Sequence, residues 1–408
     1  MLLAVACQIG AVRLRVPAIV LLLPVGFVGG HFVPSLDGAE TLGAAFSPMV
    51  SLAVAVILFD AGLDLELRQL EGHSQRVVRR LLGLGIPLTW AGATVLALAL
   101  LDVSGAAALM LGAIVIVSGP TVVAPLLDTA RPGRRVTKIL GWEGATIDPF
   151  GAIIGALVFQ ALVNDVHVGA GQAVSAFLRS IGVGLVGGAI GTIVLWLVLS
   201  RLRLVGELAT EAILAVVIGT AALCDAFRDD TGLIAAIVIG AAFANVPGLE
   251  LPADRRFFRT VVGLVIGVLF ISISATVTVE SVRSVVWPTL ALVAGLVLLV
   301  RPLVAVLATV GTSLSWRERA FVGWMHPRGI VAASTAAGFG APLAASGIEG
   351  ADDLVPVTFV VIMATVTIYG LTAGSVSRRL GLAESVEEER DEPDRPDEPA
   401  APPPVGGA

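Results

Sequence analysis

Long runs of apolar residues, separated by short polar stretches, recur along almost the whole chain. Apolar runs of about 17 to 25 residues are long enough to cross the hydrocarbon core of a bilayer as helices. This spacing predicts an all-α polytopic membrane protein with about thirteen transmembrane helices. The first segment is too short to cross alone. The predicted segments are 1–12, 16–33, 47–65, 79–101, 105–127, 136–162, 171–200, 207–225, 231–246, 257–279, 285–312, 317–342 and 354–377.

Composition supports the membrane class. The chain is 56% hydrophobic and 14% charged, whereas a soluble domain carries about 25% charged residues. Cys7 and Cys224 both lie in or beside apolar segments, which argues against a disulfide framework. The sequence contains no glycine-rich phosphate loop, no nucleophile elbow and no basic nucleic-acid patch. We therefore expect a lipid bilayer as the surrounding partner, no nucleic acid, no cofactor and no enzymatic activity.

The last part of the chain has a different character. Residues 384–398 are rich in Glu, Asp, Pro and Arg, a composition that cannot bury a core. We expect a transmembrane exchanger-like domain at 1–380 and a disordered, acidic, Pro-rich cytoplasmic tail at 381–408. The tail is either a solvated segment without a specific role or a site for a regulatory partner.

Arginine residues predict the orientation, because they gather in cytoplasmic loops. With the N-terminus outside, every inner loop is basic and every outer loop is acidic or nearly neutral. We therefore expect a multi-pass protein of the cell inner (plasma) membrane with a cytoplasmic C-terminus. The inner loops hold Arg13 and Arg15, Arg68 to Arg80, Arg131 to Lys138, Arg201 and Arg203, Arg255 to Arg259, Arg317 and Arg319, and Arg378 and Arg379. The outer loops hold Asp37 and Glu40, Asp102, Asp165, Asp225 to Asp230, Glu280 with Arg283, and Glu349 to Asp353.

Two segments carry helix-breaking residues. The fifth contains Ser118-Gly119-Pro120, and the twelfth contains His326-Pro327-Arg328-Gly329. Proline removes a backbone donor and glycine relaxes the backbone, which membranes tolerate where the backbone lines a cavity. The breaks are seven segments apart, so segments 1–6 and 8–13 would form two six-helix halves of opposite orientation. Matched broken helices in inverted repeats mark the binding site of secondary transporters.

Charged residues inside the spans indicate the chemistry. Glu143 and Asp148 lie in 136–162, Arg301 lies in 285–312, and Arg328 lies inside the second helix break as a further core residue. A central acid costs about 2.5 to 3.5 kcal/mol and an unpaired arginine is also costly, so partners are expected. We assign Glu143 and Arg301 to a structural ion pair. Asp148 would then bind a cation and a proton in turn. The reverse pairing, Arg301 with Asp148 and with Glu143 as the cation and proton carrier, remains an alternative.

Other polar residues near the spans have weaker cases. Asp60, Glu207 and Glu211 lie at inner helix ends and are interpreted as vestibule charges. His326 is either a pH sensor or a hydrogen-bonded structural residue beside the helix break.

These motifs resemble the monovalent cation:proton antiporters, in their NhaP-like, sodium/proton exchanger branch. The resemblance runs from about residue 4 to residue 380. It is carried mainly by Glu143-x4-Asp148-Pro149, Arg301-Pro302 and Pro327-Arg328-Gly329. It implies that Asp148 is the cation and proton carrier and that Glu143 pairs with Arg301. It also implies crossing unwound segments in helices 5 and 12, a homodimer, and elevator-like movement of a six-helix core.

Two positions depart from the family pattern. The family's helix-5 motif is usually Thr-Asp-Pro, where this chain has Ser118-Gly119-Pro120. The family usually has Asn or Asp before the helix-6 aspartate, where this chain has Ile147. The expected oxygen ligands of a monovalent cation are therefore Asp148, Ser118 and Thr146, with nearby carbonyls and water.

The function expected from these residues is secondary active antiport. One Na⁺ or K⁺ would exchange for one H⁺ by competition at Asp148. Such exchange would be electroneutral, because Arg301 neutralises Glu143 and Ile147 cannot titrate. The alternatives are an ion-sensing membrane protein that does not transport, and an organic-anion symporter on a similar scaffold.

Overall fold

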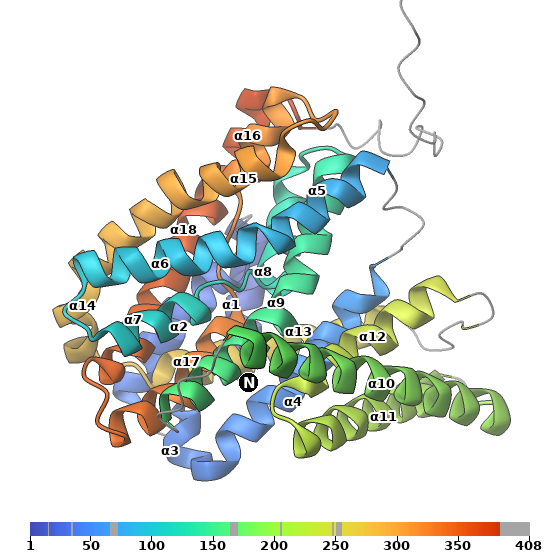
Figure 1. Cartoon of the computed structure of the whole chain (residues 1–408). Coiled ribbons are helices and arrows are strands. Elements are labelled where there is room, and N and C mark those ends of the chain that lie inside the picture. Colours follow the sequence, from blue (N-terminus) through green and yellow to red (C-terminus); the bar gives the residue numbers. More distant parts are fainter. Residues whose placement is uncertain are drawn as a thin grey trace, which may run out of the picture.

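The computed structural model describes residues 1–14, 16–33, 36–65, 72–163, 170–204, 206–246, 249 and 255–383. Within these ranges the regular structure is helical (Figure 1). The first half contains α1 (Leu2–Leu14), α2 (Ile19–Phe32), α3 (Gly38–Leu42), α4 (Phe46–Leu63), α5 (Gly72–Gly83), α6 (Gly85–Leu100), α7 (Gly105–Ile114), α8 (Pro120–Ala130) and α9 (Arg134–Val163). The second half contains α10 (Ala170–Leu202), α11 (Gly206–Phe227), α12 (Thr231–Asn245), α13 (Arg255–Ala275), α14 (Val279–Gly295), α15 (Arg301–Thr309), α16 (Trp316–Trp324), α17 (Ile330–Ala345) and α18 (Leu354–Leu380).

The described helices include six that are long and apolar enough to cross a membrane. They are Ser74–Leu100, Arg134–Val163, Gly171–Leu202, Gly206–Phe227, Val279–Thr309 and Ala351–Leu380. Shorter apolar helices of 10–17 residues occupy most of the other predicted segments. The chain is thus an all-α protein with membrane-spanning helices, as the apolar pattern predicted.

Two predicted segments have internal irregularities that the pattern did not reveal. The segment at 79–101 consists of α5 and α6, which meet at Leu84 between two glycines. The segment at 285–312 begins earlier, at Val279, and passes through a π-helix at Leu296–Val300 before α15. Pro302 lacks the N–H that an α-helix would use one turn back, which accounts for the irregular turn at this place.

Small residues allow the helices of one region to pack closely. The helices α10, α11 and α12 lie side by side (Figure 1). Helix α12 also packs against α4, where a Cβ on Gly240 would lie 2.2 Å from the carbonyl oxygen of Phe59. Glycine at such a contact lets two membrane helices approach closely, and their association then rests on backbone packing.

The two predicted helix breaks are real interruptions. Helix α7 ends at Ile114 and α8 begins at Pro120, with non-helical backbone between them. Helix α16 ends at Trp324 and α17 begins at Ile330. The long helix α9 runs past both interruptions and carries Glu143 and Asp148 on its buried positions.

The C-terminal helix α18 ends at Leu380. Gly381 takes a left-handed conformation (φ 66°) and its N–H bonds back to the carbonyl of Arg378, which closes α18. The acidic segment 384–408 lies outside the described residues, as do Arg15, Arg68 and Asp165 of the orientation argument.

Candidate functional site

The two non-helical segments cross each other at a pair of glycines. A Cβ on Gly329 would lie 2.9 Å from the Cα of Gly119, so Gly329 has no room for a side chain, and a Cβ on Gly119 would be tight, at 3.3 Å from the Cα of Gly329. Helix α8 begins directly after Gly119, and α17 begins directly after Gly329. The N-termini of α8 and α17 therefore lie at the crossing. Each N-terminus carries partial positive charge, which favours an anion nearby.

Asp148 lies against this crossing. Its side chain is 1% exposed, and it accepts a hydrogen bond from the backbone of Ser118. A Cβ on Gly119 would lie 3.2 Å from Asp148 Oδ2, so the glycine leaves space beside the carboxylate. The other oxygen, Oδ1, is buried and has no hydrogen-bond partner within the described ranges. A buried carboxylate oxygen without a donor is costly, unless a proton or a cation binds to it.

Thr121 is a candidate ligand that the sequence argument did not select. Its Oγ1 is buried and has no hydrogen-bond partner within the part of the chain described. The same Cβ position on Gly119 that faces Asp148 would lie 3.4 Å from Thr121 Oγ1. Both oxygens therefore border the space beside Gly119. The signal in the sequence was its place two residues after the glycine of the break.

The other two expected oxygen ligands, Ser118 and Thr146, differ in their position relative to Asp148. Ser118 is buried, and its backbone bonds to Asp148. Thr146 is half-buried on α9. Two residues of an α-helix turn the side-chain direction by about 200°, so Thr146 and Asp148 point to different sides of α9.

Glu143 lies on α9 more than one turn before Asp148 and has a different environment. Its two carboxylate oxygens accept hydrogen bonds from Arg301 Nη1 at 2.6 Å and Nη2 at 2.8 Å. Arg301 Nε donates to the carbonyl oxygen of Val322 at 3.0 Å, which fixes the guanidinium from the other side. Both side chains are 4% exposed. Bidentate geometry with every carboxylate oxygen occupied is what a buried ion pair requires.

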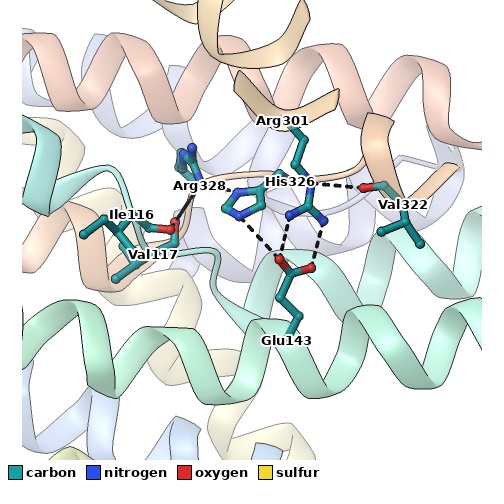
Figure 2. A network of polar contacts seen from close by, with 7 residues as sticks. All are labelled: Ile116, Val117, Glu143, Arg301, Val322, His326 and Arg328. Atoms are coloured by element: carbon teal, nitrogen blue, oxygen red, sulfur yellow. Dashed lines mark hydrogen bonds and ion pairs between the residues drawn. The ribbon is translucent and has the colours of Figure 1, made fainter. Parts of the chain in front are cut away.

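Arg328 joins the crossing to this ion pair (Figure 2). Its Nη1 donates to the carbonyl oxygens of Ile116 and Val117, at 3.4 and 3.3 Å, and contacts His326 Nδ1. These carbonyls follow the end of α7, where the helix no longer supplies their partners. His326 Nε2 in turn lies 3.8 Å from Glu143 Oε1. The broken segments are therefore connected to α9 and α15 by one continuous set of polar contacts.

An open cavity of about 410 Å³ reaches the start of α8, where Pro120 and Thr121 line it. Trp142 of α9 also lines this cavity. Charged residues also line it: Asp60 of α4, Asp64 just after α4, Asp128 of α8, Lys138 of α9 and Arg259 of α13. Asp60, expected as a vestibule charge, is thus at the wall of a cavity that an ion could enter.

The sequence and the fold define the protein class. The family model of the sodium/hydrogen exchangers, transmembrane, matches residues 1–379, and the chain belongs to this family. The family consists of cation:proton antiporters, which are transporters and not enzymes, as the motifs predicted.

Individual relatives are more distant. The chain is 24% identical over 375 residues to a protein named K(+)/H(+) antiporter NhaP2 from Shewanella sp. (strain MR-4), covering 90% of this chain and 63% of that protein. A protein of the same name from Shewanella oneidensis is 23% identical over 373 residues, with the same coverage. The chain thus spans 63% of the length of these relatives.

Solved structures share the fold. The sodium proton antiporter MjNhaP1 from Methanocaldococcus jannaschii, solved at pH 8, matches with a TM-score of 0.78 and 18% identity. The match covers 94% of this chain and 97% of that one. An electron microscopy map of the same antiporter matches with a TM-score of 0.73 and 19% identity.

Proposed function

We propose that this protein exchanges a monovalent cation, Na⁺ or K⁺, for H⁺ across the membrane by competition at Asp148. The observation that carries the proposal is the contrast between two buried acids of α9. Glu143 has both oxygens bonded to Arg301, whereas Asp148 has an oxygen without a partner in the described structure. Only the second acid is available to take up an ion.

The neighbours of Asp148 suit both the ionised, cation-bound carboxylate and the protonated acid. When the carboxylate is ionised, the N-termini of α8 and α17 and the nearby Arg328 offset part of its charge. A cation would bind Asp148 Oδ1, with Thr121 Oγ1, Ser118 and water as further oxygen ligands. Oxygen ligands suit hard cations. When the cation leaves, a proton on Oδ1 removes the cost of a bare buried charge.

The stoichiometry follows from counting groups that can change charge. Glu143 is neutralised by Arg301, and Ile147 beside Asp148 is a buried apolar residue. One carboxylate then carries one cation in one direction and one proton in the other. We therefore propose electroneutral 1:1 exchange.

The membrane arrangement is also a proposal. We propose thirteen spans in two inverted six-helix halves, with the N-terminus outside and the C-terminus in the cytoplasm. The cavity wall contains Lys138 and Arg259, which the arginine distribution assigns to the cytoplasmic side. This structure would then be open to the cytoplasm. The family resemblance further supports a homodimer whose core moves like an elevator.

The relatives' names point to different ions, K⁺ for NhaP2 and Na⁺ for MjNhaP1. The first experiment therefore compares Na⁺, K⁺ and Li⁺ in proteoliposomes that contain a pH dye and an imposed proton gradient. At least one of these cations should dissipate the gradient. The rate should not change when a membrane potential is imposed, since the proposed exchange moves no net charge.

The decisive variant is Asp148→Asn, which keeps the shape of the side chain and removes its charge. Cation-driven proton movement should fall to the level of empty vesicles. Glu280→Gln is the matched control, because Glu280 is an exposed acid in the first turn of α14. Normal exchange by Asp148→Asn would refute the assignment of the carrier. Cation binding without flux in the unmodified protein would instead favour an ion sensor.

A further inference from the structure

His326 lies at the centre of the polar network, although its role was open in the sequence. The residue is 4% exposed and belongs to the non-helical backbone between α16 and α17. Its two ring nitrogens face different partners, Arg328 on one side and Glu143 on the other (Figure 2). It is the link between the crossing and the Glu143–Arg301 pair.

The chemistry of the partners determines which nitrogen carries the proton. A guanidinium can only donate hydrogen bonds, so Nδ1 beside Arg328 Nη1 must accept. The proton of the neutral ring is therefore on Nε2, which faces Glu143 Oε1. A second proton on Nδ1 would remove the acceptor and place a third positive charge between Arg301 and Arg328.

The Arg328 guanidinium needs the hydrogen-bond acceptor that His326 provides. Its guanidinium is held through Nη1 by two carbonyls and by His326, while its Nε is buried without a hydrogen-bond partner among the described residues. Four groups act electrostatically on this guanidinium: Glu143, Arg301, Asp148 and the Tyr369 hydroxyl of α18. Without the contact to His326, only the two carbonyls of these three acceptors would hold Nη1 against the attraction of the remaining carboxylate, that of Asp148.

We propose that His326 is a positioning residue of the transport site. Its Nδ1 keeps the Arg328 guanidinium on the carbonyls of Ile116 and Val117, and so prevents this charge from pairing with Asp148 in place of a transported cation. This inference rests on the proposed cation exchange at Asp148. His326 would then set the apparent affinity of Asp148 for the cation without contacting the cation.

Two substitutions separate the two contacts of the ring. His326→Asn puts an amide oxygen near the position of Nδ1 and retains an acceptor for Arg328. His326→Gln puts its terminal amide near the position of Nε2 and loses that acceptor. In proteoliposomes, His326→Asn should keep the apparent KM for the cation within about twofold of the unmodified protein. His326→Gln should raise KM by about three- to tenfold and leave the maximal rate within about twofold, since one hydrogen bond to a charged group is lost.

The outcomes distinguish this inference from the proposed function. If both variants have the unmodified KM, or if both lower the maximal rate equally without a change in KM, His326 has no positioning role. If His326→Gln does not fold, His326→Ala supplies the same test, because it also lacks the acceptor and should show the raised KM. A KM for His326→Ala equal to that of the unmodified protein would overturn the inference. Failure of the proposed function appears separately, as transport that is absent from the unmodified protein or retained by Asp148→Asn.

Discussion

Gly119 and Gly329 are in backbone contact where the two interrupted helices cross, and this contact excludes a side chain at Gly329. The backbone of Gly329 is extended (φ −123°), a conformation that any residue can adopt. The need for glycine here is therefore purely one of space. The same contact brings the start of α8 and the start of α17 to one point beside Asp148.

Gly329→Ala should therefore disturb the site without straining the local backbone. The added methyl group would lie 2.9 Å from the Cα of Gly119, and the two segments would have to separate. Overpacking of this kind costs about 1–3 kcal/mol. We expect a lower melting temperature of the detergent-solubilised protein and weaker exchange in proteoliposomes. Gly219→Ala on α11 is the control, because its Cβ would meet nothing within 4 Å. Equal effects of the two substitutions would contradict the steric explanation.

The Glu143–Arg301 pair predicts an asymmetry between single and double substitutions. Glu143→Gln leaves the buried Arg301 guanidinium without a countercharge, and breaking a buried pair from one side costs about 3–5 kcal/mol. Arg301→Gln leaves the buried carboxylate unpaired and should cost a similar amount. The double variant Glu143→Gln/Arg301→Gln removes both charges and should be more stable than either single variant. Melting temperatures of the three proteins test this, and additive losses would argue against a direct pair.

The sequence predicted the parts of the site that depend on the cost of burying charge. Arg301 in an apolar segment predicted an acidic partner, and in the structure it donates hydrogen bonds to Glu143. The helix breaks at Gly119-Pro120 and Pro327-Gly329 were visible because proline and glycine have strong local effects. The family pattern added the expectation that the two breaks cross.

Contacts that depend on three-dimensional approach were not predictable in the same way. Thr121 directly follows the helix break in the sequence, but its place beside Asp148 depends on the path of the non-helical backbone. The bridge made by His326 needs both Arg328 and Glu143 within reach, and those residues are far apart in the sequence. The division of 79–101 into α5 and α6 leaves no break in the apolar pattern.

A pH effect on stability is expected from the loop between α11 and α12. Burial, followed by the neighbouring carboxylates of Asp225 and Asp229, raises the pKa of Asp230 from 3.8 to about 7. The folded state thus retains a proton that the unfolded chain releases, and stability falls as the pH rises from about 4 to 7. Asp230→Asn removes this titration, and asparagine tolerates the left-handed conformation at this position (φ 60°).

The variant Asp230→Asn should melt at a higher temperature than the unmodified protein at pH 8. The difference should shrink as the pH falls below 7 and vanish near pH 4, where the aspartic acid is protonated in both states. The exposed Glu349 supplies a control, as Glu349→Gln should leave the pH profile unchanged. A difference that is constant between pH 5 and 8 would show that the Asp230 charge is not responsible.

Thr121 provides the sharpest test of the ligand set, because its hydroxyl can be removed without a change in shape. Thr121→Val keeps the branched side chain at the start of α8 and loses the oxygen that borders the space beside Gly119. If that oxygen binds the transported cation, the apparent KM for the cation should rise about three- to tenfold, as for the loss of one polar contact. Thr121→Ser retains the hydroxyl and should keep KM near that of the unmodified protein. Cation exchange by both variants should still require Asp148. Each substitution is therefore also combined with Asp148→Asn, which should abolish exchange. Equal KM values for the valine and serine variants would remove Thr121 from the site and leave Asp148 with Ser118, backbone carbonyls and water.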